Sequence, residues 1–208
     1  MKRVNKKPEI RRNEIIETSM ELFRAKGYDQ TAVSDIVKKL SIAQGTFFYH
    51  FKTKKDIMIA IVERLVDEKI TKIKALAETE EMSAEAKLYA ILWRQSYDDE
   101  SIIEFLHHEY NASIHQKVLV QIVQESVPYV IQILEQGIAE GTFQIQDLQE
   151  TAEFILVGVN IMFDTGIFLW QENSLDQKKL AFNRIVERML GNSFTFSNPN
   201  SISQLPIN

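Results

Sequence analysis

Apolar residues recur every three or four positions along most of the chain, which is the spacing of amphipathic α-helices, and the alternation typical of β-strands is scarce. Turn residues and capping side chains divide this pattern into segments. The spacing predicts an all-α protein of about nine helices, over approximately residues 9–26, 33–40, 44–50, 53–76, 83–97, 101–110, 113–137, 147–171 and 174–190.

Local signals mark several of these boundaries. Gly27 supplies the left-handed residue that commonly ends a helix, and Gly141 does the same after the seventh segment. Ser83 is expected to cap the fifth helix, and Pro128 is expected to kink the seventh. Three further pairs predict helix starts with an N-cap and an acid or amide in the first turn: Thr53 with Asp56, Asp147 with Glu150, and Ser174 with Gln177.

The second and third helices are separated by residues 41–43 alone, which predicts a helix-turn-helix over about residues 32–51. Its inward positions are apolar, and the outer side of the second of these helices carries Gln44, Thr46, Phe48, Tyr49 and His50. A recognition helix in the DNA major groove reads base edges mainly from its N-terminal residues, here Gln44 and Thr46. The groups expected to hold phosphates are Tyr49, His50, Lys52 and Lys54.

Charge is distributed unevenly along the 208 residues. Residues 1–55 carry a net charge of +7, whereas residues 56–208 carry −12. A basic head on an acidic body indicates a polyanion-binding module attached to a part that binds no polyanion. The basic arm, residues 1–8, is expected to be flexible and either follows the DNA backbone or serves as a solubilising tail.

Several of these residues form a longer pattern. It comprises R-x-x-I-I from Arg12, E-L-F-x-x-x-G-Y ending at Tyr28, Thr31, Asp35-Ile36, and G-T-F-F-Y-H-F over residues 45–51 with Lys52 and Lys54. In this pattern the chain resembles the TetR/AcrR family of bacterial transcriptional regulators. It departs from the family at Ala32, Ser41 and Phe48, where Thr, Gly and Tyr are usual. A left-handed turn at Ser41 would cost about 1 kcal/mol.

The resemblance implies a DNA-binding domain over residues 9–56 and an effector-binding and dimerisation domain over residues 57–191. Residues 192–208 are polar and rich in turn residues, which predicts a tail. The residues that it implies for DNA contact are Thr31, Gln44, Gly45, Thr46, Phe48, Tyr49, His50, Lys52 and Lys54.

The last two long helices are apolar on more than one side, which favours pairing with their copies as a four-helix bundle, although burial within one subunit would also explain the pattern. Two recognition helices must lie one DNA turn apart to read a palindrome, and this favours a homodimer. The residues expected at the interface are Gly158, Ile161, Thr165, Leu169, Ile185 and Met189.

Asn160 and Asp164 lie four residues apart on one face of an otherwise apolar helix. A buried carboxylate needs a cation, a hydrogen-bond donor or a proton, so Asp164 either lines an effector cavity, makes a structural hydrogen bond or faces its copy in a dimer. The residues expected to line an effector cavity are Trp93, Tyr97, Phe105, His107, His108, Tyr110, Asn160, Phe163, Asp164 and Trp170.

Enzyme classes find little support. The chain has no cysteine, and His108-Glu109 begins the metalloprotease pattern H-E-x-x-H but Ala112 stands at its last position. Ligation of a cation by His108 and His115 with Glu104 or Asp164 is less favoured than ordinary hydrogen bonding, so neither a metal nor a cofactor is expected. The longest apolar stretch, residues 154–170, is too short to span a bilayer, and residues 1–10 lack the apolar core of a signal peptide.

These observations predict a cytoplasmic, homodimeric regulator without a membrane partner. We expect a repressor that binds a palindromic double-stranded operator and is released by a small-molecule effector. The alternatives are a DNA-binding regulator controlled by a protein partner, and a helical ligand-binding protein with a non-functional DNA head.

Overall fold

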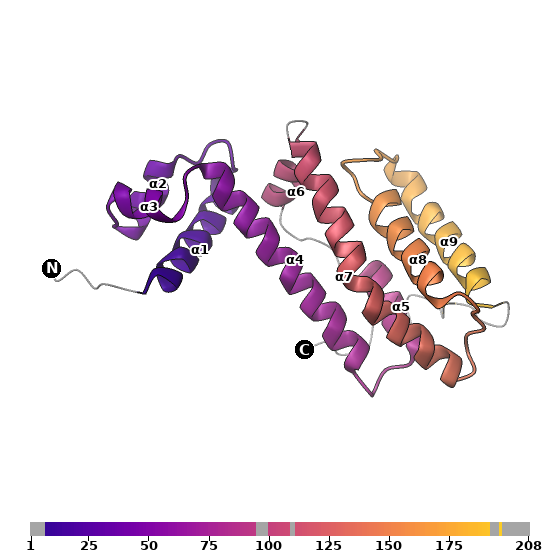
Figure 1. Cartoon of the computed structure of the whole chain (residues 1–208). Coiled ribbons are helices and arrows are strands. Elements are labelled where there is room, and N and C mark those ends of the chain that lie inside the picture. The colour runs from indigo at the N-terminus through magenta and orange to yellow at the C-terminus, as the bar shows by residue number, and fades with distance from the viewer. Residues whose placement is uncertain (1–6, 95–99, 109–110, 192–195, 197–208) are drawn as a thin grey trace. The chain divides into compact units, whose positions relative to one another are not determined.

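The computed structural model describes residues 7–94, 100–108, 111–191 and 196. In that part of the chain it contains nine α-helices and no strand (Figure 1), which confirms the predicted fold class. The helices are α1 (Pro8–Lys26), α2 (Val33–Leu40), α3 (Gln44–His50), α4 (Lys54–Glu78), α5 (Ala84–Trp93), α6 (Glu100–His107), α7 (Ala112–Ala139), α8 (Leu148–Met162) and α9 (Glu172–Met189).

Several predicted helix ends are confirmed by their backbone geometry and hydrogen bonds. Gly27 ends α1 with φ +83°, and its N–H donates to the Phe23 carbonyl over 2.8 Å. Thr53 and Asp56 cap α4 reciprocally, because each accepts a hydrogen bond from the backbone N–H of the other. The Ser83 hydroxyl accepts from the Ala86 N–H at the start of α5.

The predicted extent of α8 is wrong, because the helix ends at Met162 rather than near residue 171. Asp164 competes with the helix for backbone donors: its Oδ1 accepts from the Gly166 N–H over 2.8 Å, and its carbonyl accepts from the Phe168 N–H over 2.9 Å. Trp170 donates from Nε1 to the Met162 carbonyl over 2.7 Å and closes this turn back onto the end of α8.

Two predicted capping pairs are also wrong. The Asp147 side chain makes no capping hydrogen bond at the start of α8. Ser174 lies within the first turn of α9, where its hydroxyl donates to the Gln171 carbonyl over 2.8 Å. Both errors arise because short polar residues can satisfy local backbone groups in more than one way.

The chain divides into two compact units. The first comprises residues 1–67 and 97–112, and therefore contains α1–α3, the beginning of α4, and α6. Its core is formed by apolar side chains that are almost fully buried: Ile15, Ile16, Phe23, Ile36, Phe47, Phe51, Ile57 and Phe105. Exposed ion pairs of Lys26 with Asp35 and Lys39 with Glu21 also join α1 to α2.

The second unit comprises residues 68–96 and 113–208, with the rest of α4, α5, α7, α8 and α9. In it α8 and α9 run side by side (Figure 1), and a Cβ added at Gly158 would lie 2.8 Å from the Phe182 ring. Phe143, in the turn after α7, is 2% exposed and packs against Gly137. Among the described residues, no helix combines the length and the apolar character needed to cross a membrane.

Candidate functional site

The helix-turn-helix of the first unit is built around the turn at residues 41–43. Ser41 has φ 52° and ψ 41°. It therefore adopts the left-handed conformation considered for this position from the sequence, although it is not a glycine. Its N–H donates to the Lys38 carbonyl, and the Ile42 N–H donates to the Val37 carbonyl. These bonds close α2 and let α3 start at Gln44.

One face of α3 anchors the helix and the opposite face is open to solvent. Phe47 is fully buried and packs near Phe51 at a ring distance of 6.4 Å. Phe48 and Tyr49 are 45% and 76% exposed, so two aromatic side chains lie on the surface of this short helix. Large apolar groups held in solvent by a rigid helix are available to a macromolecular partner.

The polar residues predicted to contact DNA are arranged around this open face. Gln44 and Gly45 are exposed at the start of α3, Thr46 is half-buried, and Lys52 is exposed just after the helix. His50 is half-buried, and its burial, followed by the nearby charges of Arg12 and Arg11, lowers its pKa below the usual value. Its imidazole is therefore neutral near pH 7 and can donate one ring N–H.

Two residues predicted to contact DNA make contacts within the first unit: Thr31 is buried there and Lys54 is half-buried. Thr31 is 1% exposed, and its hydroxyl donates to the Gly27 carbonyl over 2.8 Å, so this side chain holds the turn after α1. The resemblance implied that Thr31 contacts DNA, whereas in the structure its hydroxyl faces the interior of the first unit. Lys54 donates from Nζ to the Tyr28 carbonyl over 2.8 Å and lies 4.1 Å from the centre of the Tyr28 ring. Burial lowers the pKa of Lys54, and the charge of Asp29 opposes that shift.

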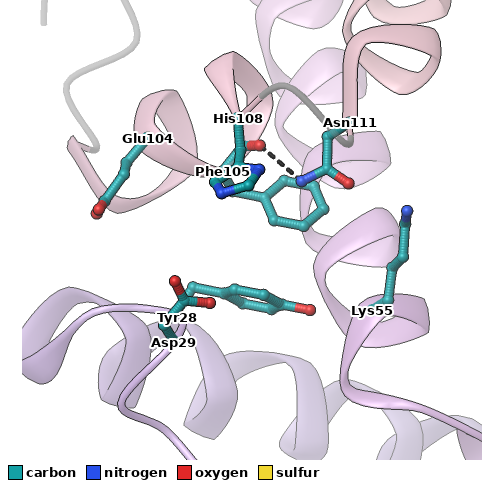
Figure 2. A pocket seen from close by; sticks show the side chains of 7 residues that line it. All are labelled: Tyr28, Asp29, Lys55, Glu104, Phe105, His108 and Asn111. Atoms are coloured by element: carbon teal, nitrogen blue, oxygen red, sulfur yellow. Dashed lines mark hydrogen bonds between the residues drawn. The ribbon is translucent and has the colours of Figure 1, made fainter.

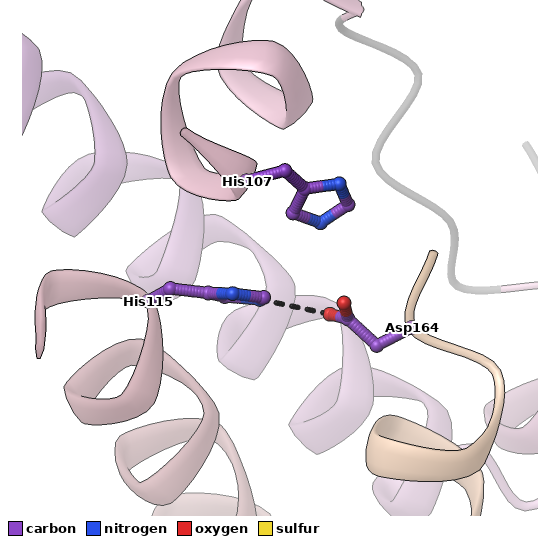
Figure 3. A group of neighbouring side chains, drawn as sticks. All are labelled: His107, His115 and Asp164. Carbon is purple, nitrogen blue, oxygen red and sulfur yellow. Dashed lines mark hydrogen bonds and ion pairs between the residues drawn. The ribbon is translucent and has the colours of Figure 1, made fainter. Parts of the chain in front are cut away.

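In the second unit, a polar cluster joins α4, α7 and the end of α8. His115 Nε2 and Asp164 Oδ2 are 2.9 Å apart, and both side chains are about nine-tenths buried (Figure 3). Lys69 donates from Nζ to Asn160 Oδ1 over 3.5 Å. Burial lowers the pKa of Lys69 to about 8, although the charge of Asp164 acts in the opposite direction.

This cluster contains two of the predicted effector-site residues, Asn160 and Asp164, together with two that were not predicted. His115 was considered only as a possible metal ligand, and Lys69 was not considered. The position of Lys69 could have revealed it, since it follows Val66 by three residues and precedes Ile73 by four on the buried face of α4.

An aromatic group lies in the same unit. The rings of Trp93, Phe163 and Phe182 meet edge to face at centroid distances of 5.0–5.8 Å, and Trp93 Nε1 donates to Asn183 Oδ1 over 2.9 Å. Trp170 stacks on Phe168 near the surface instead. The remaining predicted effector residues divide between the first unit, which holds Phe105, His107 and His108, and positions outside the described residues, namely Tyr97 and Tyr110.

The predicted dimer residues also separate into two groups. Leu169 is 91% exposed, Ile185 is 46% exposed, and Thr165 is exposed in the turn after α8, while Ile161 and Met189 are half-buried. Gly158 instead lies against Phe182 of the same chain, so its lack of a side chain serves the packing of α8 on α9.

Comparisons with known proteins agree with this architecture. Residues 15–61 match the family described as bacterial regulatory proteins, tetR family, and residues 95–185 match the family described as tetracyclin repressor-like, C-terminal domain. The fold is similar to that of RolR in a crystal structure of its complex with resorcinol, with a TM-score of 0.60 and 18% sequence identity. The similarity covers 97% of this chain and 96% of the RolR chain.

Curated relatives match mostly over short segments of the chain. The HTH-type transcriptional regulator YvdT of Bacillus subtilis is 40% identical over 60 residues, which are 29% of this chain and 31% of YvdT. IcaR of Staphylococcus aureus, described as a negative transcriptional regulator of the biofilm operon icaADBC, is 41% identical over 46 residues, or 22% of this chain and 25% of IcaR. The matched segment thus spans a third or less of each of these relatives.

Proposed function

Because the chain belongs to the TetR/AcrR family of bacterial transcriptional regulators, a family of DNA-binding proteins and not of enzymes, we propose that it is a repressor. In this proposal it binds a palindromic operator as a homodimer and is released by a small-molecule effector. IcaR, a negative regulator, supports repression rather than activation.

The observation that carries the proposal is the open face of α3. Gln44 and Thr46 at its N-terminal end would read base edges in the major groove, while Tyr49 and Lys52 would contact the flanking phosphates. Phe47 keeps this face outward because its fully buried ring fixes the rotation of the short helix. The same rigid presentation is what a recognition helix requires.

Dimerisation is supported by the apolar surface of α8 and α9. Phe154 and Val157 on α8 are 62% and 42% exposed, and Leu180 and Ile185 on α9 are 52% and 46% exposed. Large apolar side chains exposed on two neighbouring helices favour an interface with a partner. Pairing α8 and α9 with their copies would cover these side chains, and a dimer supplies the two α3 helices that a palindrome requires.

Effector binding is proposed for the second unit, where the polar cluster of Lys69, His115, Asn160 and Asp164 lies. Buried charged groups of this kind are rare unless they are paired or serve recognition. The RolR complex with resorcinol supports a small organic effector in a protein of this fold. A screen of small molecules by thermal shift would detect effectors that raise the melting temperature of the chain.

The DNA-binding part is tested by selecting genomic DNA fragments with the purified protein at low and at higher salt. We expect one palindromic sequence whose affinity falls steeply with salt concentration. Lys52→Ala should weaken binding and reduce the salt slope by about one, whereas Lys72→Ala, which removes an exposed lysine from α4 in the second unit, should leave both unchanged. Tyr49→Ala should weaken binding without unfolding the protein.

Failure to select any sequence at either salt concentration would refute the proposal. So would equal effects of Lys52→Ala and Lys72→Ala, because binding would then reflect overall charge rather than the surface around α3. Sedimentation that finds only a 24.1 kDa monomer at micromolar concentration would refute the dimer.

A further inference from the structure

The first unit contains a cleft that lies apart from the open face of α3. Its volume is about 260 Å³, and it is lined by residues from the turn after α1, the first turn of α4, and α6, together with His108 and Asn111 (Figure 2). These residues are Tyr28, Asp29, Lys55, Glu104, Phe105, His108 and Asn111. The space corresponds to about nine water molecules, so it suits a single-ring molecule rather than a larger ligand.

Two aromatic rings form the apolar walls of the cleft. Tyr28 and Phe105 meet edge to face, with their ring centres 5.0 Å apart. Phe105 is 4% exposed, and its carbonyl accepts a hydrogen bond from the buried Asn111 side chain over 2.9 Å. The Tyr28 ring is fixed by Phe23 at 5.2 Å and by Lys54 at 4.1 Å. These walls are therefore preformed and would not have to be ordered by a ligand.

The charged side chains that line the cleft are separated by sign, whereas Lys54, which is not part of the lining, donates from Nζ to the Asp29 carbonyl over 3.4 Å and lies against the Tyr28 ring. The carboxylates of Asp29 and Glu104 lie towards one end in Figure 2, and the Lys55 ammonium lies at the other end, beyond the Tyr28 hydroxyl. Within the described residues, neither carboxylate takes part in an ion pair. One carboxylate belongs to the turn after α1 and the other to α6, so a cation placed between them would be attracted from both sides.

We propose that this cleft binds a small organic cation, a primary amine on a single ring. The ring would pack against Tyr28 and Phe105, and the ammonium would lie between Asp29 and Glu104. Aromatic faces add to the attraction for a cation, and a negatively charged analogue would meet two carboxylates at the same place.

The strength of this site is limited by its exposure. Asp29 and Glu104 are exposed, and ion pairs in water contribute modestly because solvent screens them. A ligand of about ten heavy atoms in such a site should bind with a dissociation constant of about 1 mM. The Lys55 ammonium lines the same cleft and repels an added amine, so its removal should strengthen the binding of that amine.

A ligand in the cleft would contact the DNA-binding helices and α6 at once. It would therefore favour the arrangement in which Tyr28 and Phe105 are in contact, and by linkage its affinity would differ between the free and the operator-bound protein. This consequence rests on the proposed function, whereas the binding of the amine does not.

The experiment compares two probes of the same ring and size, tyramine as the cation and 4-hydroxyphenylacetate as the anion. Their dissociation constants are measured by ligand-observed NMR on the full-length protein without DNA. We expect tyramine to bind at least fivefold more tightly than the anion. Asp29→Asn and Glu104→Gln should each weaken tyramine by about fivefold, and Lys55→Gln should tighten it. Glu63→Gln, an exposed carboxylate of α4 that does not line the cleft, is the matched control and should have no effect.

Equal affinity for the two probes, or equal effects of Glu104→Gln and Glu63→Gln, would overturn the site. The consequence for DNA is measured separately, as the change in operator affinity on adding tyramine to the wild-type protein and to Glu104→Gln. A change in the wild type alone supports the linkage, and no change in either overturns it. A protein that binds tyramine but selects no operator would overturn the proposed function while leaving the amine site intact.

Discussion

Replacing Lys69 by Met tests the physical reading of the polar cluster in the second unit. Lys69 carries its ammonium into the interior, next to Asn160 and within the field of Asp164. Its pKa falls from 10.5 to about 8, so the folded protein holds this proton less tightly than the unfolded chain does. Methionine keeps the length of the side chain and removes the charge.

The expected magnitude follows from that difference in pKa. The unfolded chain retains the Lys69 proton up to about pH 10.5, whereas the folded protein releases it near pH 8. Between these values the unfolded state binds more protons, so the contribution of this group to stability rises with pH. At pH 7 the charged lysine costs about 3 kcal/mol, and at pH 9.5 the cost falls by about 2 kcal/mol.

The assay is urea denaturation followed by circular dichroism at pH 7.0 and pH 9.5. We expect Lys69→Met to raise the free energy of unfolding at pH 7.0, and its advantage over wild type to shrink by about 2 kcal/mol at pH 9.5. Lys72→Met, which removes an exposed ammonium three residues along the same helix, should change stability by less than about 0.5 kcal/mol at both values. An advantage of Lys69→Met that is the same at both pH values would refute the reasoning, because desolvation of a titrating ammonium cannot be independent of pH.

Two further substitutions test the packing of the two units. Thr31→Val should lower the free energy of unfolding by about 1 kcal/mol, since it removes the hydrogen bond to the Gly27 carbonyl, and should leave the operator affinity of the folded protein unchanged; a weakened operator affinity would return Thr31 to the DNA contacts. Gly137→Ala should destabilise the protein by about 2 kcal/mol, because the new Cβ would lie 2.0 Å from the Phe143 ring. In a Phe143→Ala background the same substitution should be neutral or stabilising, and a loss of equal size in both backgrounds, measured by urea denaturation, would contradict this contact.

The parts of the fold that follow local rules could be predicted from the sequence. The reciprocal cap of Thr53 and Asp56 and the turn at Gly27 depend on residues within four positions of one another, and both are present in the structure. Ser41 also follows from local geometry, because the short connection between α2 and α3 imposes a positive φ on the residue at this position, whether or not it is a glycine. The open face of α3 was predictable for the same reason, since a helix of known phase with Phe47 inward must turn Tyr49 outward.

Prediction failed where one polar side chain had two local options. Asp164 was assigned to the interior of a long helix because apolar residues continue on both sides of it. Its carboxylate instead accepts from the Gly166 N–H and pairs with His115, 49 residues earlier in the chain, and the helix stops at Met162. The apolar residues that follow, including Leu169, lie in the exposed turn after α8. Their apolar character therefore belongs to an exposed surface and does not indicate a continued buried helix.

A candidate site could be predicted only where its residues lie close together in the sequence. The residues of α3 form one surface because they lie within a single helix, whereas the effector residues were chosen by type alone and divide between the two units. Tyr28 and Phe105 are 77 residues apart, and no periodicity joins the turn after α1 to α6. Their contact brings Asp29 and Glu104 to the same cleft, and a pair of carboxylates that carries no signal in the sequence thereby becomes a site with a definite charge preference. The chemistry of such a site is a property of the packing of α6 on α1, and substitutions at Phe105 should therefore alter it without touching either carboxylate.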